Sequence, residues 1–456
     1  MIKDTFIYFL SKFLPSLISF VILLIYLSKM TPTNYGFFSV LIVSFGLIGI
    51  FTSQWIRSSM VRYYYEINNV IGITVILQVI VAIIICFLIA FAKFIFNFDL
   101  KIALISTMII LNILINELYN NYYRIVLKPN VVLWGNVIKN TFYVIFLIIV
   151  LAADKANVLF EQALIAFLIG LLFSNLYYIL STSYKQFEIR LESSAIKKFL
   201  KYGLPLTISF SLGVLLQNID KYMITYILGV KSNGNYSIVF DFIHNYLYMI
   251  MGAIGLASLP RILKNKNKVN IDSEFSKYIK LFHLICMPIL FVFVIFTPEL
   301  TYVINMFDYE TNVYILILIG IATYFHGINS YIYGQAYQLK ESTKNILLPS
   351  FIAILVNILV NLLLLEKYGV IISAISTLLA FIVSNFMLSL NIKLKSHKLN
   401  HKKHMLLIFS IILTSCLLMV PIISIWINLV FKIIVLLIII SVIFWNKRKI
   451  LKGEIL

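Results

Sequence analysis

One apolar stretch of the sequence, residues 101 to 126, carries polar side chains at every fourth position. Asn112, Asn116, Asn120 and Arg124 follow that spacing, and Glu117 lies next to the second of them. Residues four apart share one face of an α-helix, so the spacing predicts a helix with a single polar stripe. Amides and a guanidinium on such a stripe could bind the hydroxyl groups and negative charge of a hydrated ligand. They could equally form hydrogen bonds that hold neighbouring helices together.

Charged side chains interrupt other apolar stretches as well. Lys139, Asp220, Lys221 and Asp241 all lie inside such stretches. A charge inside a membrane span costs about 2.5–3.5 kcal/mol on insertion scales, so these residues are expected to face protein or water. Asp220 lies about nine residues, or roughly 14 Å along a helix, from the end of its stretch, near the middle of a bilayer. These charges could bind a ligand or an ion, or could pair with each other and fix helix packing.

The chain that carries these side chains is built almost entirely of apolar stretches. A helix needs about 20 apolar residues to span a bilayer, and fourteen stretches of that kind occur along the sequence. They cover residues 5–28, 36–56, 70–95, 101–126, 131–152, 160–183, 204–229, 236–260, 276–297, 311–338, 345–366, 370–392, 405–426 and 428–446. With 61% hydrophobic and 12% charged residues, the composition excludes a soluble globular protein. We therefore predict an all-α integral membrane protein with about 14 transmembrane helices.

The net charge of +19 is explained by the side of the membrane on which Lys and Arg gather. If the N-terminus is cytoplasmic, the basic segments 185–201, 261–268, 393–403 and 447–449 are all cytoplasmic, and the opposite hinges carry few Lys or Arg. This asymmetry follows the positive-inside rule and predicts that both termini are cytoplasmic. We therefore attribute the positive charge to the orientation of the protein in the membrane and to attraction by anionic lipid headgroups, and not to nucleic-acid binding.

A weak internal repeat divides the chain. Asn34-Tyr35-Gly36 follows the first predicted helix, and Asn235-Tyr236-Ser237 follows the seventh. The repeat predicts a six-helix first lobe over residues 1–192 and a six-helix second lobe over 193–395, with an appended helix pair and basic tail over 396–456. Two such lobes would enclose a central cavity, and rocking of the lobes would open it to each side in turn.

Several chemical signatures are missing from the sequence. It has no GxxxxGK[ST] phosphate loop, no nucleophile motif and no metal-ligand cluster. Cys86, Cys286 and Cys416 all lie in apolar stretches and indicate no disulfide framework. The first apolar stretch has no small-residue cleavage site, so we expect it to be a retained helix. The sequence predicts a protein that is not an enzyme and has no resident cofactor.

The motifs around the first and seventh helices identify a family resemblance. The hinge Asn34-Tyr35-Gly36, the stretch Asn218-Ile219-Asp220-Lys221-Tyr222 and Pro205 near the start of the seventh helix are similar to patterns in the Wzx-type polysaccharide flippases. These belong to the multidrug/oligosaccharidyl-lipid/polysaccharide (MOP) exporter superfamily. The resemblance covers essentially the whole chain and includes the two six-helix halves and the extra pair.

The resemblance implies transport of undecaprenyl-pyrophosphate-linked oligosaccharide units across the cytoplasmic membrane of a bacterium. Its end product would be a surface polysaccharide such as O-antigen, lipopolysaccharide or capsule. The implied partners are the lipid-linked substrate, membrane lipids, and a polysaccharide polymerase with its chain-length machinery, but no nucleic acid. Two other functions remain open: an ion-coupled small-molecule antiporter with the same lobes, and a membrane glycan polymerase or ligase, for which the outer loops are too short.

In such a flippase, three groups of residues acquire expected roles. The candidates for the diphosphate are Arg57, Arg62, Arg124, Lys139 and Lys221. The candidates for the sugar path are Asn116, Asn120, Gln217, Asn218 and Tyr333. The candidates for Na⁺ or H⁺ coupling and gating are Glu117, Asp220 and Asp241. Because the acidic residues offset much of the cationic charge within the spans, a strongly anion-selective cavity is not required by the sequence.

Overall fold

The computed structural model describes residues 2–67, 69–97, 99–153, 157–182, 193–264, 271–339, 343–391, 430 and 432. Regular secondary structure within these residues is helical, and 11 helices are long and apolar enough to cross a membrane, with Leu14–Lys29 as a shorter apolar helix. The prediction of an all-α, multi-pass membrane protein is confirmed. The predicted spans 405–426 and 428–446 lie outside the described residues, apart from Val430 and Lys432.

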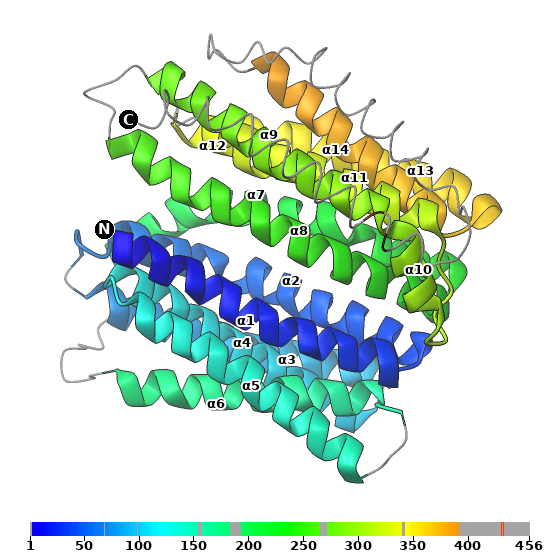
Figure 1. The fold of residues 1–456 in the computed structure, drawn as a ribbon. Helices are drawn as coiled ribbons and strands as arrows, with labels where there is room; N and C mark the ends of the chain where they lie inside the picture. Colours follow the sequence, from blue (N-terminus) through cyan, green and yellow to red (C-terminus); the bar gives the residue numbers. More distant parts are fainter. Residues whose placement is uncertain are drawn as a thin grey trace.

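The first half of the chain forms six long helices that lie side by side (Figure 1). They are α1 (Ile2–Lys29), α2 (Pro32–Tyr63), α3 (Val70–Phe96), α4 (Leu100–Ile125), α5 (Pro129–Ala153) and α6 (Phe160–Ser181). Each coincides with a predicted span. Helix α2 begins earlier than predicted because Thr31 caps it, accepting a hydrogen bond from the backbone N–H of Asn34, and Pro32 fits the first helical position.

The second half repeats this pattern with more irregular helices. It consists of α7 (Ser193–Leu228), α8 (Val230–Lys264), α9 (Ile271–Ile295), α10 (Thr297–Asn305), α11 (Val313–Gly327), the π-helix η1 (Ile328–Tyr333), α12 (Gly334–Leu339), the 3₁₀ helix η2 (Thr343–Ile346), α13 (Leu347–Tyr368) and α14 (Ile371–Asn391). The single span predicted over 311–338 is thus α11, η1 and α12 in succession. Helix α10 was not predicted; it is short, and Pro298 occupies its first turn.

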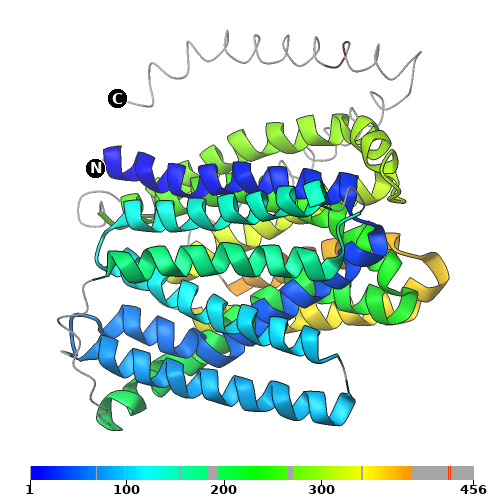
Figure 2. The ribbon, with the colours of Figure 1, turned by 90° about the horizontal axis from the view of Figure 1, so that it is seen from below.

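Two groups of helices, α1–α6 and α7–α14, which we call the first and second lobes, meet through their first helices (Figures 1 and 2). Helix α2 packs against α7 and α8, and α1 packs against α8. At the end of the bundle that holds the α1–α2 and α7–α8 turns, which we call the hinge end, glycines allow the backbones to touch. A Cβ atom added to Gly36 would lie 2.2 Å from the Val230 carbonyl oxygen, and one added to Gly234 would lie 1.7 Å from that of Pro32.

Matching hydrogen bonds in the two lobes support the internal repeat. In the first lobe, the side-chain amide of Asn116 donates to Ser174 and Asn175, at 2.9 and 3.0 Å. In the second lobe, Asn329 donates to Ser384 and Asn385, at 2.8 and 2.9 Å. Helices α4 and α6 are therefore joined in the same way as η1 and α14. The lobe boundaries at residues 192 and 395 stay predictions.

One described residue of the appended region contacts the second lobe. Lys432 is buried, and its ammonium group forms an ion pair with Glu299 of α10, with nitrogen–oxygen distances of 2.6 and 2.9 Å. It also donates to the carbonyl oxygen of Ile295 at 2.9 Å. This buried pair ties Lys432 to the hinge end of α9 and α10.

Candidate transport cavity

A cavity of about 580 Å³ lies between the two lobes. Helices α1, α2, α5 and α6 of the first lobe and α7 and α8 of the second lobe contribute to its wall. Its charged and amide side chains are Lys139, Asn140, Asn218, Lys221, Asp241 and Asn245, and its hydroxyl groups come from Ser16, Ser19, Ser39, Tyr26, Tyr35, Tyr143 and Tyr246. The lining therefore offers two cations, one carboxylate and many uncharged hydrogen-bonding groups to a ligand.

The second lobe contributes an ion pair to this cavity. The ammonium group of Lys221 on α7 lies 2.9 and 3.1 Å from the two carboxylate oxygens of Asp241 on α8. Lys221 is buried, whereas the Asp241 side chain is 21% exposed. The hydroxyl of Tyr35, on α2 of the first lobe, donates to Asp241 at 2.8 Å. The carboxylate therefore links two helices of one lobe to the other lobe.

The first lobe contributes a lone cation. Lys139 on α5 lines the cavity, and within the described residues its ammonium group forms no hydrogen bond or ion pair. The neighbouring Asn140 donates to the hydroxyl of Ser19 at 2.9 Å and to the carbonyl oxygen of Pro15 at 2.8 Å. Because the amide is held in this way, Lys139 is the group on this wall that is available to an anionic ligand.

Asp220 faces away from the cavity into the second lobe. It is buried with 1% of its surface exposed, and no Lys or Arg of the described residues forms an ion pair with it. Its carboxylate instead accepts several hydrogen bonds from uncharged groups, at 3.0 to 3.4 Å apart from a closer one from Thr377. The donors are Asn357 and Asn361 of α13, Ser376 and Thr377 of α14 and Tyr236 of α8.

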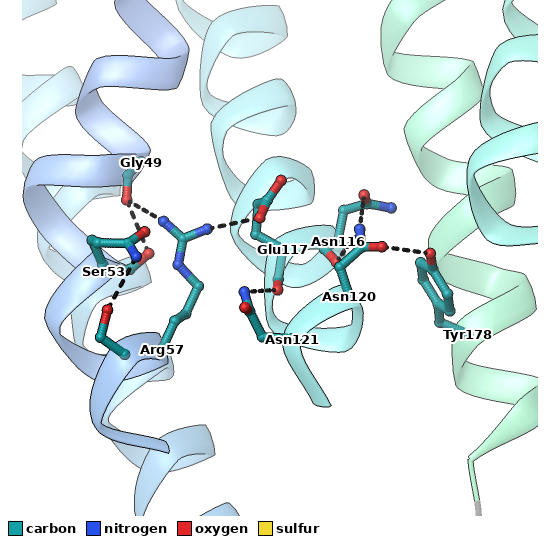
Figure 3. A network of polar contacts seen from close by, with 10 residues as sticks. Gly49, Ser53, Arg57, Asn116, Glu117, Asn120, Asn121 and Tyr178 are labelled. Atoms are coloured by element: carbon teal, nitrogen blue, oxygen red, sulfur yellow. Dashed lines mark hydrogen bonds and ion pairs between the residues drawn. The ribbon is translucent and has the colours of Figure 1, made fainter. Parts of the chain in front are cut away.

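Arg57 and Glu117 form a separate pair inside the first lobe (Figure 3). The guanidinium of Arg57 on α2 lies 3.2 Å from the carboxylate of Glu117 on α4 and donates to the Gly49 carbonyl at 3.3 Å. Arg57 is buried with 4% of its side chain exposed, and Glu117 is half-exposed. Neither residue lines the cavity described above. Their roles in diphosphate binding and ion coupling stay predictions, and the geometry matches an ion pair that fixes α2 against α4.

The amide stripe of α4 points at α6 and not at the cavity. Figure 3 shows Asn120 directed toward Tyr178 of α6, whose hydroxyl donates to it at 3.0 Å. Asn120 in turn donates to Asn116, and Asn175 donates to Asn112, both at about 3 Å. Asn116 and Asn120 are buried. These contacts are the interhelical hydrogen bonds that the sequence left open as an alternative, and a sugar-path role for the two residues stays a prediction.

The remaining predicted residues are scattered. Arg62 is exposed and pairs with Glu66 at 2.9 Å, and Arg124 is exposed at the end of α4. Gln217 lies on α7 outside the cavity lining, and Tyr333 is buried within the second lobe against Leu388. Of all the predicted site residues, those that the structure brings together at the cavity are Lys139, Asn218, Lys221 and Asp241.

Some residues of the site were missing from the predicted set. Asn357 and Asn361, which surround Asp220, are four residues apart in an apolar stretch and show the same signal as the stripe of α4. Tyr35 was noted only as part of a hinge motif. A tyrosine in a membrane helix is common at interfaces and in cores, so its contact with Asp241, 206 positions away in sequence, had no sequence signal.

The two lobes are in direct contact at the hinge end, and we call this arrangement closed. The hydroxyl of Tyr309, between α10 and α11, donates to the carbonyl oxygen of Met30 at 2.9 Å, and Asn233 donates to that of Gly36 at 3.1 Å. Burial raises the pKa of the Tyr309 phenol, so it remains protonated and able to donate. The ring of Tyr35 packs edge-on against that of Tyr309, with ring centres 6.4 Å apart. The closure therefore continues directly into the Asp241 contact.

Comparison with known proteins identifies a protein family for this chain and solved structures with a similar fold. A family model described as polysaccharide biosynthesis protein matches residues 1–266, which is more than half of the chain. The chain belongs to the polysaccharide biosynthesis protein family. The matched residues include the whole first lobe, the cavity-lining parts of α7 and α8, and the Lys221–Asp241 pair. Among curated protein sequences, none is significantly similar to this chain.

Several solved structures share this fold over most of the chain. The lipid II flippase MurJ, in an inward closed conformation, is similar with a TM-score of 0.69 and 17% identity over 98% of this chain and 99% of that one. An inward-facing MATE family multidrug resistance transporter of the MOP superfamily gives 0.60 and 14% identity over 85% and 94%. A MOP superfamily transporter from Pyrococcus furiosus gives 0.55 and 14% over 86% and 95%. At these identities the likeness shows the fold, and the chemistry must be argued from the cavity of this chain.

Proposed function

We propose that this polysaccharide biosynthesis protein is a flippase that moves undecaprenyl-pyrophosphate-linked oligosaccharide units across the bacterial cytoplasmic membrane by alternating access. The observation that carries the proposal is the cavity between the lobes, where Lys139 and Lys221 stand among hydroxyl and amide groups. A diphosphate carries multiple negative charges and needs cations, whereas a sugar needs many uncharged donors and acceptors. No covalent chemistry is required of the protein.

Each lobe would contribute one cation to the diphosphate, and the two cations differ in how readily they can bind it. Lys139 has no ion-pair partner among the described residues, so its charge is available as soon as a phosphate enters. Lys221 is already paired with Asp241 and must share its ammonium protons or give up that pair. The polar groups of Asn218 and Asn245 would meet the sugar. Because the wall of the cavity combines both lobes, a ligand held between Lys139 and Lys221 would respond to any rocking of one lobe against the other.

We infer that a coupling cation, Na⁺ or H⁺, acts at Asp220. A buried carboxylate surrounded by uncharged hydrogen-bonding groups, with no cationic partner among the described residues, is costly unless it binds a cation. A proton would bind the carboxylate directly. For Na⁺, the amides of Asn357 and Asn361 would turn over to present oxygen in place of nitrogen, which an Asn side chain can do without moving its backbone.

The test is a sidedness assay in liposomes that contain the reconstituted protein and a lipid-linked oligosaccharide. Protein-dependent access of an externally added glycosidase to the sugar is expected, and Lys139→Ala should abolish most of it while Lys139→Arg retains it. The matched control is Lys128→Ala, an exposed lysine beyond the end of α4. Unchanged access with well-folded protein, with native-type glycans and with imposed Na⁺ and H⁺ gradients, would reject the flippase.

A second candidate is an ion-coupled small-molecule antiporter. The specific observation in its favour is the combination of the Asp241 carboxylate with the rings of Tyr26, Tyr35 and Tyr246 in the cavity, which suits an organic cation. It predicts gradient-driven uptake of a cationic dye into inverted vesicles, lost in Asp241→Asn. Sugar translocation without dye transport would leave the flippase as the function.

The cellular setting follows from the same proposal. We place the protein in the cytoplasmic membrane with both termini inside, so the hinge end faces outward and the basic segments face the cytoplasm. Its product would pass to a polysaccharide polymerase and chain-length machinery. A protease added from either side of sealed vesicles, followed by detection of a C-terminal tag, tests this orientation.

A further inference from the structure

Tyr35, Asp241 and Lys221 form a chain of contacts from the closed hinge end to the cation in the cavity. The Tyr35 ring packs between Tyr26 and Tyr309, at 6.0 and 6.4 Å between ring centres, and its hydroxyl reaches Asp241 at 2.8 Å. Asp241 holds Lys221 at 2.9 Å. All three residues of the chain of contacts line the cavity. A change at the ammonium group of Lys221 therefore acts on a contact between the lobes.

The Lys221 ammonium group has a spare donor that a phosphate can use. It carries three N–H bonds, and the two oxygens of Asp241 accept from it. A diphosphate is more highly charged than a carboxylate, so it competes well for the same ammonium group. When Lys221 turns to the phosphate, the hydroxyl of Tyr35 is the one hydrogen-bond donor left to Asp241 among the described residues, and the carboxylate faces the negative charge of the ligand. A partly buried carboxylate in that position is costly, and water at an opened hinge end relieves the cost.

We propose that Asp241 is a displaceable internal anion, which holds Lys221 and Tyr35 in the empty cavity and opens the hinge end when a phosphate-bearing ligand takes Lys221. The inference rests on the proposed function only in taking a diphosphate as the ligand. It assigns Tyr35 as the latch between the lobes, a role that the flippase proposal does not contain. A neutral sugar would fill the cavity without releasing the latch, so only the anionic part of the substrate triggers opening.

The experiment reports hinge-end opening with a single cysteine in the cavity. Ser39 on α2 is buried, lines the cavity, and differs from cysteine by one atom. In a full-length background with Cys86, Cys286 and Cys416 replaced, Ser39→Cys is labelled by a membrane-impermeant thiol reagent added outside right-side-out vesicles. The vesicles are loaded with inorganic pyrophosphate, with sulfate, or with neither.

Labelling should be slow in empty vesicles and should rise about tenfold with pyrophosphate inside, because a hydrogen bond to a charged group corresponds to about a ten- to hundredfold change in an equilibrium. Tyr35→Phe removes the latch hydroxyl and should give fast labelling in empty vesicles. Tyr222→Phe is the matched control, because the hydroxyl of Tyr222 also crosses between lobes, to Ser44 at 2.8 Å, without touching a charge. It should respond to pyrophosphate as the parent does.

Asp241→Asn separates anion binding from opening. It should bind pyrophosphate more tightly than the parent, since Lys221 loses its competing anion, yet labelling should no longer respond to pyrophosphate. Asp241→Glu should restore part of the response. Thermal unfolding of each variant in detergent identifies a folding defect, and Tyr35→Phe, which removes one oxygen atom, keeps the test valid if the Asp241 variants are unstable.

The latch is overturned if Tyr35→Phe labels as slowly as the parent in empty vesicles, or if Asp241→Asn retains the full response to pyrophosphate. A parent that does not respond to pyrophosphate also overturns it. These results are distinguishable from failure of the flippase proposal. Sugar translocation without a pyrophosphate response rejects the latch alone, whereas a response without sugar translocation keeps the latch and rejects the lipid-linked sugar as its ligand.

Discussion

Replacement of Gly234 by alanine is expected to shift the protein toward a state with an open hinge end. An added Cβ would lie 1.7 Å from the Pro32 carbonyl oxygen and 2.5 Å from its carbonyl carbon. Cβ atoms do not approach other heavy atoms closer than about 3.0 Å, so α2 and α8 must separate by at least 1.3 Å, the difference between 3.0 and 1.7 Å. Both partners are backbone atoms, so rotation of a side chain cannot relieve the clash.

The size of the shift toward the open hinge end follows from the energy of the clash, which is present only when the hinge end is closed. Overpacking of a tight contact costs about 1–3 kcal/mol, and here the cost falls only on the closed hinge end. That corresponds to about a 5- to 150-fold shift toward opening. Helix α8 itself is not weakened, because alanine is favoured over glycine in a helix by about 1 kcal/mol and Gly234 is not among the glycines with positive φ. External labelling of Ser39→Cys measures the shift.

Gly213→Ala in α7 provides the control, since a Cβ there meets nothing within 4 Å. It brings the same gain in helix propensity without a clash and should label like the parent. If Gly234→Ala also labels like the parent and unfolds at the same temperature, the backbones of α2 and α8 are not in contact at Gly234. If it only lowers the unfolding temperature, the hinge end is a fixed structural contact and does not open.

Three further predictions concern the lobes themselves. Asp220→Asn keeps the size of the side chain but removes its charge, so translocation should lose all stimulation by Na⁺ and H⁺ gradients, measured by imposing each gradient separately. Asn116→Ala and Asn329→Ala should each lower the free energy of unfolding by about 0.6–2 kcal/mol and leave translocation of the lipid-linked sugar by folded protein unchanged; a loss of translocation in folded Asn116→Ala would instead support its sugar-path role. Glu299→Gln leaves the buried ammonium group of Lys432 without its counter-charge and should destabilise the protein by about 3–5 kcal/mol, whereas the double replacement Glu299→Leu and Lys432→Met should recover most of the loss in thermal unfolding.

The spans were predictable because bilayer thickness dictates their length and composition. Every predicted span from residue 5 to residue 392 coincides with helices of the structure. Departures occur where the backbone is irregular. The π-helix η1 lies inside one predicted span, and hydropathy does not distinguish a π-helix from an α-helix. Helix α10 is too short to produce a transmembrane signal.

The site was harder to predict because periodicity gives the face of a helix but not its neighbour. The stripe of Asn116 and Asn120 is real, yet it faces α6. Arg57 was predicted to bind the diphosphate, and no periodicity in the sequence relates it to Glu117, 60 positions away; the packing of α2 on α4 joins them. By contrast, Lys221 and Asp241 were each singled out, but their pairing and its extension to Tyr35 depend on how two helices turn about their axes.

The repeat also explains why a coupling ion would act on one lobe. The hinge motifs Asn34 and Asn235 are 201 positions apart, and the same offset pairs Ser19 with Asp220. In each lobe an amide from a later helix reaches that position: Asn140 donates to Ser19 at 2.9 Å, and Asn357 donates to Asp220 at 3.0 Å. The two lobes thus share this hydrogen bond, but the position is an uncharged serine in the first lobe and an aspartate in the second. A cation that binds there changes the electrostatics of α7, next to Lys221, and leaves the first lobe unchanged. Under the proposed function the two lobes therefore have different tasks: Lys139 supplies an ammonium group that has no ion-pair partner among the described residues, and α7 and α8 respond to both ion and ligand.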